Sequence, residues 1–165
     1  MVLLSVLLSI SLIINKIDSL IPLINIAAGV RIGLANIITL LVLYMFSFKE
    51  AFLLTILRVL ISGLLIGGAS SFLYSLSGGV LSVIFMYLFK KIFKNNISEI
   101  GVSVIGAFMH NTGQILIMML LTKSIRVPLN YYPVILYISI ITGISIGFIS
   151  KKILLHYNKI LKFVS

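Results

Sequence analysis

The sequence predicts an all-α fold, a polytopic membrane protein built as a bundle of six transmembrane helices. Of its 165 residues, 61% are hydrophobic and only 10% are charged, whereas an ordinary soluble domain is about half apolar and about a quarter charged. The apolar residues form six separate runs, each near the roughly 20 residues that a helix needs to cross the hydrocarbon core of a bilayer. These observations exclude an ordinary soluble domain.

Short polar, proline-containing or glycine-containing breaks separate the six predicted helices. The helices cover about residues 1–17, 33–48, 51–66, 72–89, 97–121 and 131–149. The breaks contain, in order, Lys16 with Asp18, Lys49 with Glu50, the small residues at 67–71, the polar stretch at 90–96, and Pro128. We expect residues 1–150 to form one transmembrane domain. Residues 151–165 form a basic cytoplasmic tail in this prediction, and their alternation of basic and apolar residues suits a short interfacial helix.

The first run and the segment after it need separate justification. The first run lacks both a basic segment before it and an A-x-A-like cleavage site, so we expect a retained helix and not a signal peptide. Residues 22–33 are mildly apolar and rich in small residues. Such a segment can dip toward the membrane without crossing it.

The basic residues indicate orientation. There are 13 Lys and Arg residues against 3 Asp and Glu, a formal net charge of +10 at pH 7. With a cytoplasmic N-terminus, eight cations face the cytoplasm: Lys49, Lys90, Lys91, Lys94, Lys151, Lys152, Lys159 and Lys162. Four face outward: Lys16, Arg31, Lys123 and Arg126. The bias predicts a multi-pass protein of the cell membrane with both termini cytoplasmic. Cations divided between two sides do not suit a nucleic-acid partner.

The rarity of acids and the absence of cysteine limit the possible chemistry. The sequence has no cysteine, and Asp18, Glu50 and Glu99 are its only carboxylates. No two of these acids lie within thirty residues of each other, so a local pair of carboxylates for acid–base or metal chemistry is excluded. We therefore expect no catalytic residues, no metal and no cofactor.

Arg58 is the charge that needs an explanation, because it lies within an otherwise apolar run. A cation at the centre of a membrane helix costs at least about 2.5–3.5 kcal/mol. One interpretation is that its side chain extends to the headgroups, since Arg58 is about two turns from the start of its helix. The other, which we favour, is a buried role facing a ligand. The predicted cytoplasmic start of the helix places Arg58 mid-membrane or further inward.

A second polar cluster interrupts the fifth run at His110, Asn111 and Gln114. His110 and Gln114 are four residues apart and share one helix face, with Asn111 beside them. These groups suit binding a polar head group, although hydrogen bonds between helices would also explain them. A metal site at His110 is not expected, because no carboxylate is near it in the sequence and His156 lies at the opposite end. Asn36 lies at the start of the second helix. It has either a capping or packing role at that helix end, or it lines a cavity.

Small residues at four-residue spacing predict close helix contacts. Examples are Ser139, Gly143 and Gly147 in the sixth helix, and the pairs at 29 and 33 and at 63 and 67. Most of these stripes are expected to pack inside the bundle. Ser5 and Ser9 of the first helix are the best candidates for contact with a partner subunit, because the remaining face of that helix is wholly aliphatic.

Three motifs resemble a known family. They are GVRIGLANI at residues 29–37, SFLYSLSGG at 71–79 and GAFMHNTGQ at 106–114. In this order they resemble the Gx transporter family, whose members are often labelled heptaprenyl diphosphate synthase component I, and the resemblance runs from about residue 10 to 155. That family is similar to the S-components of energy-coupling factor transporters, six-helix proteins that bind vitamins and work with a T-component and two ATPases. The resemblance implies that Ser5 and Ser9 contact a T-component, although alanine is more usual there.

The sequence does not support a catalytic interpretation of the synthase label. Trans-prenyl diphosphate synthases hold magnesium and diphosphate through two aspartate-rich motifs, and this chain contains only one aspartate. It also lacks a P-loop, so any ATP-driven step requires partner subunits.

The leading interpretation is an integral membrane protein of S-component type that binds and takes up a small organic solute, vitamin-like or related to isoprenoids or quinones. The expected site lies in the outer half of the bundle, with the segment at 22–33 over it. Its predicted residues are Asn36, Arg58, His110, Asn111 and Gln114. The alternative is a non-catalytic membrane subunit associated with prenyl diphosphate metabolism.

Overall fold

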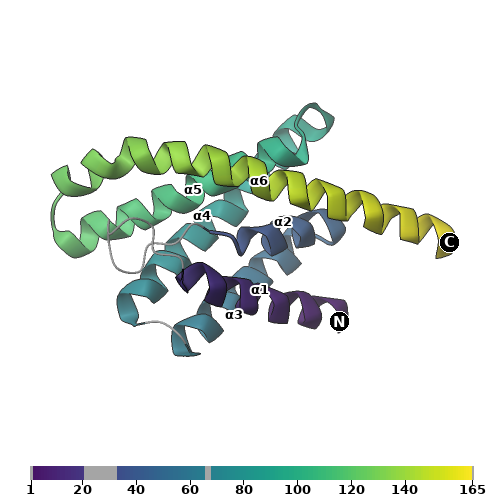
Figure 1. The fold of residues 1–165 in the computed structure, drawn as a ribbon, viewed down its shortest axis with the longest axis horizontal. Coiled ribbons are helices and arrows are strands. Elements are labelled where there is room, and N and C mark those ends of the chain that lie inside the picture. The colour runs from purple at the N-terminus through teal and green to yellow at the C-terminus, as the bar shows by residue number, and fades with distance from the viewer. Residues whose placement is uncertain (1, 21–32, 66–67, 165) are drawn as a thin grey trace.

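The computed structural model describes residues 2–20, 33–65 and 68–164. These residues form six α-helices and one short 3-10 helix, with no strand among them. The elements are α1 Val2–Leu20, α2 Asn36–Met45, α3 Phe48–Leu65, α4 Ala69–Phe93, η1 Lys94–Asn96, α5 Glu99–Thr122 and α6 Arg126–Val164. The start of α1 and the end of α6 lie at the same end of the bundle (Figure 1). The prediction of an all-helical six-helix bundle is confirmed.

Among the residues that the structure describes, four helices are long and apolar enough to cross a membrane: α1, α4, α5 and the part of α6 over Pro128–Ile160. The chain is therefore a multi-pass membrane protein. The 39 residues of α6 extend about 58 Å, and the hydrocarbon core is about 30 Å thick. The helix consequently projects well beyond the core.

In α1 the exposed face is apolar and the buried face is polar, which is the opposite of a helix on the surface of a soluble protein. Its large apolar side chains Val6, Ile10, Ile13 and Ile17 are exposed. Its buried residues include Ser11, Asn15 and Asp18, which recur at the spacing of one helix face. Lipid covers the apolar face, and the polar face is turned into the bundle. We expected Lys16 and Asp18 to close this helix near residue 17, but α1 continues to Leu20 because Asp18 points inward instead of toward water.

The central helix α2 is shorter than predicted. It covers Asn36–Met45 and not residues 33–48, most of its residues are buried, and it contacts every other α-helix (Figure 1). Gly33, with φ of +87°, and the turn after it delay the start of the helix. At the other end the Lys90 ammonium group donates a hydrogen bond to the Leu43 carbonyl at 2.8 Å. Ten helical residues span about 15 Å, so α2 does not cross the core alone.

The last helix is longer than predicted. It begins at Arg126, has Pro128 in its first turn, and continues past Pro133 to Val164. Proline fits the first turn because the backbone N–H groups there have no partner within the helix. No glycine or proline follows between residues 148 and 164, and lysine is a good helix former. The tail predicted as a separate interfacial helix therefore continues α6 without a break.

The small-residue stripe of α6 faces α5, which confirms the predicted packing role. A Cβ atom added to Gly143 would lie 2.6 Å from the Val104 Cα atom, and one added to Gly147 would lie 2.6 Å from the Ile100 Cα atom. Ser139 bonds to a side chain of α5. Small side chains let the two backbones approach, which is how helices associate in lipid.

Candidate functional site

Inside the bundle, the described residues form a small space lined by charged and polar side chains, which we call the polar cavity. Its lining includes Asn15 and Asp18 of α1, Gly33, Arg58 of α3, Ser75 of α4 and His110 of α5. The cavity has a volume of about 10 Å³, near the space that one water molecule requires. All five of these polar side chains are buried. The polar cavity therefore lies inside the packed bundle and not in a surface groove.

Asp18 joins the last turn of α1 to the segment that starts α2. Its Oδ2 atom accepts hydrogen bonds from the backbone N–H groups of Gly33, at 2.9 Å, and Leu34, at 3.2 Å. Asp18 is only 2% exposed. Both N–H groups lie in the turn just before α2, and the partial positive charge at a helix N-terminus favours a carboxylate nearby.

Arg58 does not extend to the headgroups. It is 3% exposed and lines the polar cavity together with Asp18. A Cβ atom added to Gly79 of α4 would lie 3.5 Å from the Nη2 atom of Arg58, an ordinary van der Waals distance, so the guanidinium group lies beside this glycine. Two opposite charges on one buried cavity offset part of the cost of removing each from water. The cavity brings Arg58 to the level where α1 ends and the segment before α2 begins.

The imidazole of His110 lies between two glycines. A Cβ atom added to Gly33 would lie 2.9 Å from its Cδ2 atom, and one added to Gly78 would lie 2.9 Å from its Cε1 and Nδ1 atoms. Glycine within a helix costs about 1 kcal/mol relative to alanine. Gly78 therefore weakens α4 but makes room for the His110 imidazole, which enters the bundle from α5.

Two buried polar side chains at the site have no hydrogen-bond partner among the residues that the structure describes. One is Asn36, 4% exposed, whose carboxamide nitrogen would lie 3.2 Å from a Cβ atom on Gly33. The other is Ser75, 8% exposed, whose hydroxyl group lines the polar cavity. Buried polar groups are nearly always hydrogen-bonded. Their free donors and acceptors point to a water molecule or a ligand.

Asn111 and Gln114 do not line the polar cavity. The Asn111 side-chain amide donates a hydrogen bond to the Ser139 hydroxyl of α6 at 2.7 Å, and that hydroxyl donates to the Ile135 carbonyl. Gln114 is 1% exposed and lies one turn beyond His110 on α5. Of the five residues predicted for the site, the structure brings together Arg58 and His110, with Asn36 beside them.

The sequence predictions missed Asn15, Asp18 and Ser75. Asp18 was assigned to a helix end because charged residues commonly mark the membrane surface. A signal was present in the sequence: Ser11, Asn15 and Asp18 follow the i, i+4, i+7 pattern in an otherwise aliphatic helix. That pattern indicates a polar stripe facing the interior of a bundle.

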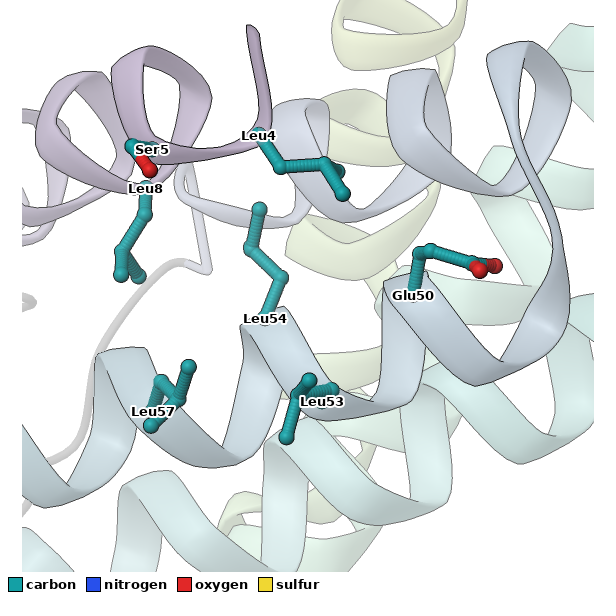
Figure 2. Close-up of a pocket in the computed structure, with 7 residues that line it drawn as sticks. All are labelled: Leu4, Ser5, Leu8, Glu50, Leu53, Leu54 and Leu57. Carbon is teal, nitrogen blue, oxygen red and sulfur yellow. The ribbon is translucent and has the colours of Figure 1, made fainter. Parts of the chain in front are cut away.

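Ser5 and Ser9 are exposed on α1, and the Ser9 hydroxyl donates to the Ser5 carbonyl at 3.0 Å. Ser5 lines an apolar groove of about 180 Å³ between α1 and α3. Figure 2 shows leucines of the two helices facing one another across it, with Glu50 at one end. A hydrogen bond from the Ser47 hydroxyl lowers the pKa of the Glu50 carboxyl, so this end of the groove is negatively charged at neutral pH.

Within the described ranges, no three His, Asp or Glu side chains gather in a group that could hold a metal ion. The segment at 22–32, which we expected to cover the site, lies outside the described residues.

The profile of one family, described as heptaprenyl diphosphate synthase component I, matches residues 7–153. No curated protein and no solved structure matches the chain.

Proposed function

The chain belongs to the heptaprenyl diphosphate synthase component I family, and from this premise and the polar cavity we propose that it is a non-catalytic membrane protein that binds a small organic solute. The solute is vitamin-like or related to isoprenoids or quinones, and the protein takes it up in the manner of an S-component. The proposal places the protein in the cell membrane with both termini in the cytoplasm.

The observation that carries this proposal is the convergence of four helices on the polar cavity. Asp18, Arg58, Ser75 and His110 come from α1, α3, α4 and α5. Ionisable side chains inside a membrane are costly, and they usually mark the path or site of a ligand. Packing alone would be served better by apolar residues of similar volume.

The proposal gives each side chain a chemical role. The Arg58 guanidinium pairs with an anionic group of the solute, because its planar fork of donors matches carboxylates and phosphates. His110 and the free groups of Asn36 and Ser75 form hydrogen bonds with the polar part. The cavity has room for about one water molecule. Binding of a larger solute therefore requires the surrounding helices to separate.

Two features of the sequence support uptake without catalysis by this chain. One aspartate and two glutamates cannot form the two aspartate-rich motifs of a prenyl diphosphate synthase. No P-loop is present, so any energy from ATP must come from partners. We propose that the groove beside Ser5 contacts such a partner, a T-component acting with ATPase subunits.

The proposal predicts that wild-type protein purified in mild detergent carries a solute that mass spectrometry identifies in a solvent extract. Arg58→Gln, which removes the charge, is expected to retain about tenfold less, because losing a charged hydrogen bond costs about 1.5–3 kcal/mol. The matched control is Asn111→Ala, which removes a buried polar group of α5 that does not line the cavity. Equal amounts of solute from all three proteins would contradict the proposal.

The family description favours a second candidate, a non-catalytic membrane subunit associated with a prenyl diphosphate synthase. The purified protein should then bind a labelled prenyl diphosphate, and magnesium should change that binding. Magnesium-independent binding of a different solute would favour the first candidate.

A further inference from the structure

The start of α2 already holds an anion, and that anion is supplied by the protein itself. The Asp18 carboxylate accepts hydrogen bonds from two successive backbone N–H groups, those of Gly33 and Leu34, in the turn that leads through Ala35 into α2. Successive backbone N–H groups in a turn form a ready site for carboxylates and phosphates, and the partial positive charge of a helix N-terminus favours an anion nearby. Asp18 occupies this site in the same way as a bound ligand.

Other polar side chains line the same cavity as Asp18. The guanidinium group of Arg58 and the imidazole of His110 lie on the same cavity. The Ser75 hydroxyl lines it, and neither this hydroxyl nor the Asn36 amide beside Gly33 has a hydrogen-bond partner within the part of the chain that the structure describes. Both side chains are more than nine-tenths buried. A larger oxyanion at this position would also accept hydrogen bonds from these two side chains.

We propose that Asp18 is the resident occupant of an anion site, and that a carboxylate or phosphate group of the bound solute replaces it. This rests on the proposed function and names the chemical class of its solute. One anion replaces another, so the charge beside Arg58 stays balanced during the exchange.

The exchange couples binding to opening of the bundle. The hydrogen bonds of Asp18 to Gly33 and Leu34 join α1 to the start of α2. When the solute takes over these N–H groups, that connection is lost. The helices can then separate and enlarge a cavity that otherwise has room for about one water molecule.

The test is a chemical rescue of Asp18→Ala. This variant leaves the two N–H groups without their acceptor and removes the carboxylate from the cavity that Arg58 lines, and its melting temperature in detergent is expected to fall by about 5–10 °C. Formate, the smallest carboxylate, should restore at least half of the loss. Formamide, a neutral molecule of similar size, and chloride at equal ionic strength should not. A parallel titration with inorganic phosphate shows whether the site prefers carboxylate or phosphate.

The control variant is Ser11→Ala, which removes a buried polar group from the same face of α1, away from the cavity. Formate should affect it no more than the wild type. Asp18→Asn keeps the size of the side chain but not its charge, so it still fills the site, and formate should stabilise it less than it stabilises Asp18→Ala. If neither Asp18 variant gains more than Ser11→Ala, the proposal is wrong.

The failure of this inference is distinguishable from failure of the proposed function. Without rescue, a solute that wild-type protein carries and Arg58→Gln loses would leave the binding function intact and reject only the exchange with Asp18. Rescue without any co-purified solute would support the anion site and count against solute binding.

Discussion

Replacement of Arg58 by methionine is expected to lower the free energy of unfolding by about 3–5 kcal/mol. Methionine keeps much of the side-chain volume but removes the positive charge, which leaves Asp18 buried at the polar cavity without a compensating cation. A buried charge without a partner of opposite sign is among the most destabilising changes in a protein. The measurement is thermal or denaturant unfolding of the purified protein in one detergent.

The double variant Asp18→Asn with Arg58→Met supplies the control. It removes both charges, so we expect it to recover more than half of the stability lost in Arg58→Met. Non-additivity of this kind is the signature of coupled residues. A double variant at least as unstable as the sum of the single variants would show that the two charges do not compensate each other.

Gly113→Ala is expected to separate α4 from α5, with a cost of about 3 kcal/mol. The added Cβ atom would lie 2.8 Å from the carbonyl carbon and oxygen of Ser77 and 2.9 Å from the nitrogen of Gly78. These are backbone atoms, which cannot rotate away as a side chain can. The Ser77 hydroxyl also donates to the Gly113 carbonyl across this contact, at 2.9 Å. Unfolding in detergent measures the loss.

Gly68→Ala is the matched control, because no atom lies within 4 Å of its added Cβ atom. Its backbone, with φ of −73°, suits alanine, so we expect a change of no more than about 0.5 kcal/mol. The separation at Gly113 also shifts Gly78, which makes room for His110. We therefore expect less co-purified solute from Gly113→Ala than from Gly68→Ala. Equal stability of the two variants would contradict the close α4–α5 contact.

Much of the fold was predictable because apolar runs in a membrane protein directly indicate helices. The length of α2 was not, because it depends on the positive φ of Gly33 and on the turn that follows. The sequence shows a glycine there but not its conformation. The continuity of α6 was also missed, because two prolines and two lysines suggested helix ends at positions where the helix continues.

The site was predictable only in part, because a helix fixes the direction and the depth of each side chain. Asn111 follows His110 by one residue and is rotated about 100° from it, which turns it toward Ser139 on α6. Gln114 shares the face of His110 but lies about 6 Å further along the axis, beyond the polar cavity. Asp18 was missed because its inward direction depends on how α1 packs against the start of α2.

The central claim is that the polar cavity admits a small anionic molecule. Its most direct test is to measure how fast a thiol placed at the cavity is modified by a charged reagent. The sequence has no cysteine, so Ser75→Cys places one thiol at the cavity without background. Ser82→Cys is the control, because Ser82 lies two turns away on the same face of α4, is fully buried, and does not line the cavity. We predict that an anionic methanethiosulfonate reagent modifies Ser75→Cys in membranes at least about tenfold faster than Ser82→Cys, and faster than a cationic reagent does. Equal, slow modification of both thiols would contradict the account.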